Sequence, residues 1–246
     1  MNEILTRQFY LNASECNSQR RISLPLLVQR LIETATDHAS RLGVGPADLR
    51  GHNLAWVLSR LSLDMNAFPA IDTRYTIETW VESINRHFTE RCFRITDGDG
   101  NTSGYARTVW IAIDLETRRG GDMTDIMSHA PIVADRCPIK RGGKIHPVTA
   151  PEAVRSHRFS YCDIDFNRHV NSCRYIEAML NDRSVEFYDE HPIKRFEIAY
   201  MDEIHYNDKV EISRSTTAGT TTYQITRDGI PATRAVIEYA GIDTVI

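Results

Sequence analysis

The sequence predicts an α+β protein built from two repeated halves, in each of which a helix accompanies an antiparallel sheet. Apolar residues follow a helical period over residues 24–42 and a two-residue period in segments after residue 54. The same order of patterns returns after residue 155, which indicates a duplicated architecture. The 246 residues suit one large or two small domains, since a domain takes about 150 residues on average.

The first helix is well marked at both ends. Apolar residues recur at steps of three and four from Leu24 to Leu42, which forms one apolar face. Ser23 is a candidate N-cap, and Pro25 fits the first turn, where a missing N–H costs nothing. The glycines and the proline of residues 43–46 predict the end of the helix.

Antiparallel strands are predicted to follow this helix. Residues 75–82 alternate apolar and polar side chains, which is typical of a strand with one buried face. The Asp-Gly-Asp-Gly sequence at residues 97–100 precedes a buried run at Thr108–Ile113, so these segments predict a hairpin.

A linker is predicted between the two halves. From Glu116 to Glu152, glycines and prolines interrupt any apolar period. We therefore expect a first repeat at residues 1–135, a linker at 136–154 and a second repeat at 155–246.

The second half repeats the plan of the first. An extended segment, Arg155–Cys162, precedes a helical period around residues 175–180, and alternating strands follow. Residues 224–229 also resemble residues 94–98, so the same type of hairpin is expected in both halves.

Composition excludes several classes of protein. The chain has 29 Lys and Arg against 33 Asp and Glu, and the scattered basic residues argue against a nucleic-acid-binding surface. The 5 cysteines form no C-x-x-C pair, so neither a disulfide scaffold nor a structural zinc site is expected. The N-terminus lacks a secretory signal, and no apolar run reaches the ~20 residues that span a membrane. We expect a cytoplasmic protein with neither membrane nor nucleic-acid partners.

The densest group of reactive side chains is Asp163–Asn171, directly before the second helix. In an extended backbone Asp165, Asn167 and His169 point to the same side, because residues two apart share a face. A carboxylate, an amide and an imidazole beside helix N–H groups can supply a base, a hydrogen-bond donor and an oxyanion site. This group is the candidate catalytic site.

The same residues also allow two other interpretations. Asp165 and Asn171 can cap a turn or the helix, while Asn167 and His169 can bond loop backbone. Asp163, Asp165 and His169 are also metal-ligand types, but no further His or Cys lies at ligand spacing. We therefore expect no metal and no cofactor.

The segment Asp163–Asn171 resembles the active-site segment of the acyl-ACP thioesterases of plants and bacteria, a double-hotdog family. The first half matches independently: Asn53–Arg60 resembles the family's N-L-x-W-V-x-x-R strand and Thr79–Val81 its T-W-V. The resemblance implies two tandem hotdog repeats, in each of which an antiparallel sheet wraps around a helix, forming an internal pseudo-dimer.

The resemblance also implies the catalytic residues. In the family, the Asp, Asn and His of this motif act with a Glu from a strand of the second half. The motif residues are here Asp165, Asn167 and His169. The family pattern of Tyr followed three residues later by Glu falls on Tyr200 and Glu203, so Glu203 is the expected fourth member.

The implied activity is hydrolysis of fatty acyl-ACP to free fatty acid and holo-ACP, which ends chain elongation in fatty acid biosynthesis. In one mechanism Glu203 and His169 deprotonate a water, and in another Asp165 attacks the thioester directly. Plant members carry a cysteine after the glutamate, but this chain has Ile204, so no thiol mechanism is expected there. The absence of a plastid transit segment suits a bacterial member.

The first repeat has Ser18–Arg21 where the second has its motif, so we expect one active site per chain. The resemblance implies that the first repeat binds the acyl chain. Candidate lining residues, which also fit a plain core, are Leu27, Leu31, Ala35, Trp56 and Trp80.

The implied partner is an acyl carrier protein that bears a fatty acyl phosphopantetheine thioester. Because this carrier is acidic, a basic docking patch is expected around the linker. Candidate patch residues are Arg118, Arg119, Lys140, Arg141 and Lys144. A hotdog acyl-CoA thioesterase and a non-catalytic acyl-binding module are the alternatives, and a homodimer stays possible.

Overall fold

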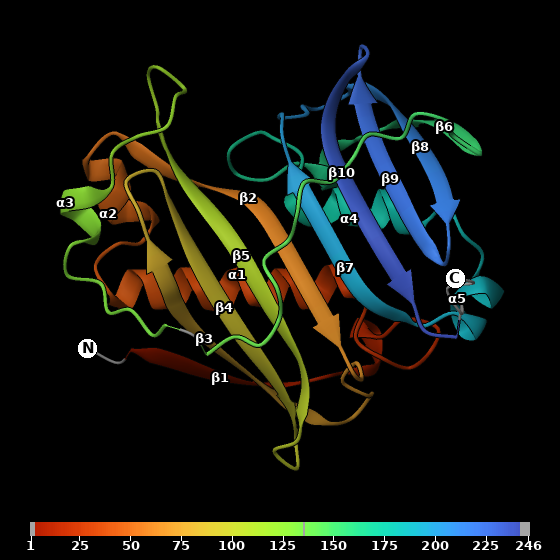
Figure 1. The fold of residues 1–246 in the computed structure, drawn as a ribbon, viewed down its shortest axis with the longest axis horizontal. Helices are drawn as coiled ribbons and strands as arrows, with labels where there is room; N and C mark the ends of the chain where they lie inside the picture. The colour runs from red at the N-terminus through yellow and green to blue at the C-terminus, as the bar shows by residue number, and fades with distance from the viewer. Residues whose placement is uncertain (1–2, 135, 242–246) are drawn as a thin grey trace. The chain divides into compact units, whose positions relative to one another are not determined.

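The computed structural model describes residues 3–134 and 136–241 (Figure 1). The chain divides into two compact units. The N-terminal unit comprises Met1–Ile22 and Leu27–Arg141, and the C-terminal unit comprises Ser23–Leu26 and Gly142–Ile246. Each unit contains an antiparallel sheet and a helix, so the predicted α+β class is confirmed.

The sheet of the N-terminal unit has the strand order β1-β3-β4-β5-β2, and all its neighbouring strands are antiparallel. The strands are β1 (Ile4–Tyr10), β2 (Leu54–Met65), β3 (Arg74–Ile84), β4 (Phe88–Asp97) and β5 (Thr102–Asp114). The helical segments are η1 (Ala13–Glu15), α1 (Leu24–Arg41), α2 (Pro46–Gly51) and α3 (Thr124–Met127).

Helix α1 has the bounds and the buried face that its sequence predicts. The Ser23 hydroxyl accepts a hydrogen bond from the Leu26 N–H at 3.3 Å, as expected of an N-cap. Leu27 and Leu31 are fully buried, and the helix lies across the strands of its unit in Figure 1. Gly43 follows the helix with φ +71°, a left-handed conformation that glycine adopts without strain.

The segment after β5 adds to the core of the N-terminal unit. Met123, directly before the short helix α3, and Met127, within it, are buried in one cluster with Leu42, Leu54 and Val81. The burial of single apolar side chains therefore holds this segment in place. Such contacts need no regular spacing, so the sequence shows no sustained period there.

The start of the predicted linker is attached to the N-terminal unit. The Arg141 guanidinium forms an ion pair with Glu90 at 2.6 Å, and the Glu90 carboxylate is almost completely buried. Arg107, which is also buried, contacts Glu82 and donates to the Ile139 carbonyl at 3.4 Å. These contacts hold this segment in place, although it has no regular secondary structure.

The sheet of the C-terminal unit has the antiparallel order β7-β10-β9-β8-β6. Its strands are β6 (Ala153–Arg158), β7 (Ile193–Tyr200), β8 (Lys209–Thr217), β9 (Thr220–Arg227) and β10 (Ile230–Tyr239). Its helical segments are η2 (Tyr161–Asp163), α4 (Ser172–Leu180) and α5 (Val185–Glu190).

The repeated sequence falls on equivalent hairpins. Residues 94–98 end β4 and begin the turn to β5, whereas residues 224–229 end β9 and begin the turn to β10. The sequence pattern does not indicate β1, α2 and α5, because such short segments have too few residues to show a period. Within the described residues, no helix combines the length and the apolar character needed to cross a membrane.

Candidate active site

The segment between η2 and α4 is a tight loop. The Asp165 N–H donates to the His169 carbonyl at 2.8 Å, and the Arg168 N–H donates to the Asp165 carbonyl at 3.0 Å. Arg168 has φ 67°, in the left-handed region. The prediction that Asp165, Asn167 and His169 share one side of an extended backbone is therefore wrong.

Asp165 explains why the loop turns. Its Oδ1 accepts hydrogen bonds from the backbone N–H groups of Asn167 at 2.8 Å and His169 at 3.3 Å. Aspartate favours turns because its short side chain can bond the backbone two residues ahead. Asp165 thus orients the loop that carries His169, while Asn167 is exposed and contributes its N–H to the turn.

Asn171 begins helix α4. Its side-chain oxygen accepts a hydrogen bond from the Cys173 N–H at 2.9 Å, so its capping interpretation is confirmed. The cap fixes the point where the helix starts, directly after the loop that carries His169. The N-terminal turn of α4 is therefore held close to that loop.

Glu203 lies opposite His169. The structure places it in the loop after β7, which ends at Tyr200, and not within a strand as the resemblance implied. Its Oε2 is 3.3 Å from the His169 Nε2. The Val170 N–H donates to the Ile204 carbonyl at 2.8 Å, so the two loops are joined by backbone beside this contact.

The geometry thus brings His169 and Glu203 into direct contact. Their side chains are 26% and 38% exposed, so solvent and a substrate can reach the pair. An imidazole beside a carboxylate can remove a proton from a water molecule, since the carboxylate stabilises the imidazolium that forms.

Two tyrosines, of which Tyr175 is buried and Tyr200 partly buried, support the loops of the site. The Tyr175 hydroxyl accepts a hydrogen bond from the Ile204 N–H at 3.2 Å, and the Tyr200 hydroxyl donates to the Ser172 carbonyl at 2.9 Å. Burial raises the pKa of both hydroxyls, so both stay neutral at physiological pH. They attach helix α4 to β7 and to the loop that carries Glu203.

Arg227, at the end of β9, supports the loop that carries Glu203. Its Nη1 donates to the Glu203 carbonyl and to Asp208 Oδ2, both at 2.9 Å, and its Nη2 donates to Asp202 Oδ2 at 3.2 Å. The bond to Asp208 raises the pKa of the guanidinium. This role is not visible in the sequence, because nothing local to Arg227 indicates its contact with the distant loop of Asp202–Asp208.

His205 is the second residue that the sequence analysis missed. It pairs with His169 through an antiparallel backbone bridge, and the two rings lie edge to face with centroids 4.9 Å apart. Its position two residues after Glu203 is visible in the sequence, but its pairing with His169 depends on the fold.

The candidate acyl-lining tryptophans have protein partners. The Trp56 Nε1 donates to the Val44 carbonyl at 2.9 Å. The Arg136 guanidinium lies over the buried Trp80 ring, 5.7 Å from the ring centroid. Their role in binding an acyl chain stays a prediction.

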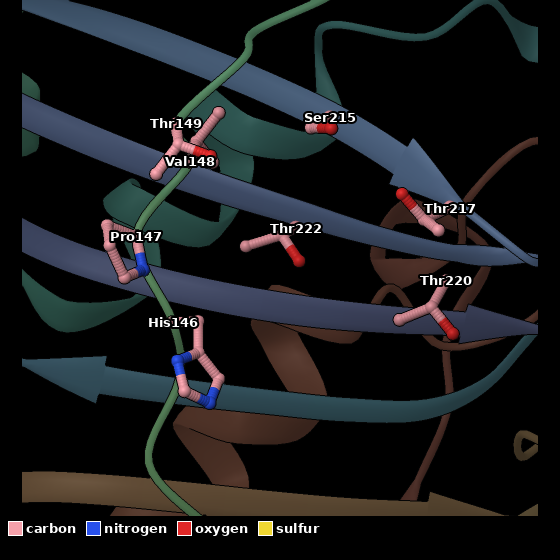
Figure 2. A pocket seen from close by; sticks show the side chains of 8 residues that line it. All are labelled: His146, Pro147, Val148, Thr149, Ser215, Thr217, Thr220 and Thr222. Atoms are coloured by element: carbon pink, nitrogen blue, oxygen red, sulfur yellow. The ribbon is translucent and has the colours of Figure 1, made fainter.

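A separate hollow of about 260 Å³ lies on the C-terminal unit, between the segment 146–149 and strands β8 and β9 (Figure 2). Hydroxyl groups dominate its lining, and it contains neither His169 nor Glu203, so it does not extend the candidate active site. The lining residues are His146, Pro147, Val148, Thr149, Ser215, Thr217, Thr220 and Thr222.

Two family models match almost the whole chain. The acyl-ACP thioesterase N-terminal domain matches residues 2–129, and the acyl-ACP thioesterase C-terminal domain matches residues 148–240. The second match includes the loop with His169 and the loop with Glu203.

Curated relatives from plants match at low identity. An oleoyl-acyl carrier protein thioesterase of Arabidopsis thaliana is 24% identical over 232 residues, which are 86% of this chain and 63% of the relative. A palmitoyl-acyl carrier protein thioesterase of Gossypium hirsutum is 23% identical over 216 residues, which are 81% of this chain and 52% of the relative. The chain therefore spans about half to two thirds of the length of these relatives.

Solved structures match over nearly the full length. An acyl-ACP thioesterase from Bacteroides thetaiotaomicron superposes with a TM-score of 0.89 and 33% identity, covering 96% of this chain and 98% of that one. A 12:0-ACP thioesterase from Umbellularia californica gives a TM-score of 0.87 at 17% identity, covering 97% of this chain and 98% of that one. The predicted double-hotdog fold is confirmed.

Proposed function

This chain belongs to the acyl-ACP thioesterase family, and on that premise we propose that it hydrolyses fatty acyl-ACP to free fatty acid and holo-ACP. The observation that carries the proposal is the contact between His169 and Glu203 at 3.3 Å, beside the start of helix α4. The reaction requires a base for water and donors for the developing oxyanion, and this place offers both.

In the proposed mechanism, Glu203 and His169 hold a water molecule and accept its proton as the oxygen attacks the thioester carbon. The Asn167 amide and N–H groups at the start of α4 stabilise the oxyanion of the tetrahedral intermediate. The C–S bond then breaks, and the phosphopantetheine thiolate leaves without much acid assistance. Asp165 acts as a positioning residue for the loop.

The hydrogen bonds of Asp165 support water, rather than this carboxylate, as the nucleophile. Its Oδ1 already accepts hydrogen bonds from two backbone N–H groups. An attack by this carboxylate on the thioester would compete with the bonds that shape the loop.

A single-turnover reaction in ¹⁸O-labelled water tests the nucleophile. We expect the label in the released fatty acid and none in the protein, as measured by mass spectrometry of the intact chain and of the peptide that contains Asp165. Label in the Asp165 carboxylate would establish a mixed anhydride and overturn the water mechanism.

Release of free acid from matched panels of acyl-ACP and acyl-CoA substrates tests the proposed substrate. We expect faster turnover of acyl-ACP, with a maximum at one chain length. Preference for acyl-CoA would instead identify a hotdog acyl-CoA thioesterase, and acyl binding without turnover would identify a binding module.

We also propose that the acyl carrier protein docks on basic residues beside the linker. Arg118 and Arg119 follow β5 in an exposed turn, where the Arg118 N–H donates to the Asp114 carbonyl. Arg141 is paired with Glu90 at 2.6 Å, so a carrier protein would have to compete with this contact.

Charge reversal tests this docking proposal. Replacing Arg118 and Arg119 by Glu is expected to raise the KM for acyl-ACP at low salt and to have less effect at high salt, because salt screens exposed charges. An unchanged KM at low ionic strength would contradict the proposal, and acyl-CoA serves as the carrier-free control substrate.

A further inference from the structure

Three metal-binding side chains converge at the mouth of the candidate active site. His169, Glu203 and His205 each offer one ligand atom, and these three atoms lie within 4.8 Å of one another. His169 and Glu203 are partly exposed and His205 is exposed, so a cation can enter directly from solvent. Sequence spacing did not show this group, because His205 lies 36 positions after His169.

The backbone that carries the three side chains is fixed by several bonds. His169 and His205 face each other across an antiparallel bridge, flanked by the bond from the Val170 N–H to the Ile204 carbonyl. The His205 N–H donates to Asp208 Oδ2 at 2.9 Å, and Arg227 bonds the same carboxylate oxygen. Only side-chain rotations are therefore needed to bring the ligand atoms together.

The distances and the ligand types favour Zn²⁺. Zinc is bound by imidazole nitrogen at about 2.0–2.1 Å and by carboxylate oxygen at about 2.0–2.2 Å. Two ligand atoms of a tetrahedral site are consequently about 3.3 Å apart, and the separation of His169 Nε2 from Glu203 Oε2 is 3.3 Å. Two imidazoles with one carboxylate suit zinc better than Mg²⁺, which prefers oxygen ligands.

We propose that His169, Glu203 and His205 form a Zn²⁺ site, and that occupancy of this site inhibits the enzyme. The inhibitory part rests on the proposed function, in which His169 and Glu203 accept the proton of the attacking water. Bound zinc would use the one acceptor nitrogen of the neutral His169 imidazole and would lower the basicity of the Glu203 carboxylate, so the pair could no longer accept the proton of the water. The metal would thereby block hydrolysis reversibly.

Zinc binding is tested without any substrate. Isothermal titration of the chelator-treated protein with Zn²⁺ is expected to show one site per chain, and Mg²⁺ is expected to give no binding. His205→Gln should weaken zinc binding at least about tenfold. The matched control is His52→Gln, because His52 is an exposed histidine at the end of α2. Equal zinc affinity in the His205→Gln and wild-type proteins would overturn the site.

Inhibition is measured as the ratio of the hydrolysis rates with and without Zn²⁺, taken for each protein against its own zinc-free rate. We expect a large decrease for the wild type and for His52→Gln, reversal by chelator, and little decrease for His205→Gln. Activation of the chelator-treated enzyme by zinc would overturn the inhibitory role.

The two readouts separate the two proposals. Zinc binding that depends on His205, in a protein that hydrolyses no thioester, would support the metal site and contradict the proposed function. Hydrolysis that zinc does not affect, in a protein that binds no zinc, would support the function and contradict the site.

Discussion

The loop Asn17–Arg21 of the N-terminal unit and the loop Asp165–His169 of the C-terminal unit have the same hydrogen bonds. In each, the first residue's N–H donates to the carbonyl of the fifth at 2.8 Å, and its carbonyl accepts from the fourth at 3.0 Å. In each, the first side chain accepts from the N–H groups of the third and fifth residues. The turn is therefore a property of the repeat and not of the active site.

The two loops also share a positive φ at the same position and a capping residue at the start of the helix that follows. The fourth residue has a positive φ in both, 58° at Arg20 and 67° at Arg168. A capping residue then begins each helix, Ser23 for α1 and Asn171 for α4. A non-glycine residue with positive φ is uncommon, so its occurrence in both copies indicates that the surrounding bonds impose it.

The side chains at the end of the loops differ. His169 pairs across its bridge with His205, whereas Arg21 pairs with Ala70. Two residues before these bridge partners lie Glu203 and Phe68. The N-terminal copy therefore has neither an imidazole nor a carboxylate at the equivalent positions.

The partner of the Arg21 side chain is a backbone carbonyl, whereas the partner of the His169 side chain is a carboxylate. The Arg21 Nη1 donates to the Phe68 carbonyl at 3.2 Å, whereas His169 Nε2 contacts the Glu203 carboxylate. The fold thus supplies the same loop in both copies, whereas the C-terminal copy places an imidazole beside a carboxylate there.

The largest expected effect comes from removing the imidazole. His169→Ala should lower kcat by about 10²- to 10⁴-fold, since a general base contributes about that much. Arg21→Ala, the same truncation in the other loop, should leave kcat nearly unchanged. Steady-state kinetics with acyl-ACP and thermal unfolding of both variants check this difference. Similar losses of kcat in two folded variants would remove the functional distinction between the loops.

A smaller effect is expected at the ends of the equivalent strands β4 and β9. Asp97 ends β4 and bonds the N–H groups of its own hairpin, Asp99 at 3.0 Å and Asn101 at 2.8 Å. Arg227 ends β9 and bonds the loop that carries Glu203. Arg227→Ala should lower kcat by up to about a hundredfold through misplacement of Glu203.

The control for Arg227 is its conservative variant. Arg227→Lys keeps the charge and can bond one acceptor, so it should recover part of the lost kcat. A variant that raises KM alone, with kcat unchanged, would show that Arg227 acts on binding and not on the position of Glu203.

The N-terminal loop predicts how substitutions of Asp165 change the free energy of unfolding. Asn17 forms the same two side-chain bonds with an amide oxygen. Asp165→Asn should therefore change the free energy of unfolding by no more than about 0.5 kcal/mol. Asp165→Ala loses both bonds and should cost about 1–2 kcal/mol.

Activity of the same variants separates position from chemistry. If Asp165 only orients the loop, Asp165→Asn should keep a kcat within about tenfold of the wild type, and well above that of Asp165→Ala. Equal and nearly complete inactivation of both folded variants would indicate that the carboxylate itself takes part in the reaction.

The parts of the fold that local patterns determine were predictable from the sequence. Helix α1 was predicted from Leu24 to Leu42, with Ser23 as its N-cap, and is observed at Leu24–Arg41, because its period and its cap lie within one segment. The turns to β5 and β10 were likewise marked by their own residues. Segment α3 was not, because its methionines are buried by contacts with distant parts of the chain.

The candidate site was predictable only in part, for a related reason. His169 belongs to a contiguous motif, so its segment could be identified, but the loop conformation could not. The alternation rule assumes an extended chain, and the side-chain bonds of Asp165 override it. His205 reaches the site through its backbone bridge to His169, and Arg227 through side-chain bonds to the loop that carries Glu203, and no local pattern encodes either contact.

The smallest expected effect is a pH dependence that arises at one pair of equivalent positions in the two copies. Leu11 and Phe159 make equivalent bonds, since their carbonyls accept from Asp72 and Asn207 respectively. Phe9 lies two residues before Leu11 in the N-terminal copy, and His157 lies two residues before Phe159 in the C-terminal copy. Burial, with a contribution from Arg155, lowers the pKa of His157 from its ordinary value of 6.5.

The folded state therefore disfavours the protonated His157 ring. Its contribution to stability is present above pH 6.5 and is lost as the pH falls through the lower folded pKa, because the unfolded chain binds the proton more readily. His157→Phe, which copies Phe9, should reduce the loss of unfolding free energy between pH 7.5 and 5.5. Urea unfolding of both proteins at the two pH values measures the difference. An identical loss in wild type and variant would show that His157 titrates alike in both states, and that this difference between the copies has no effect on stability.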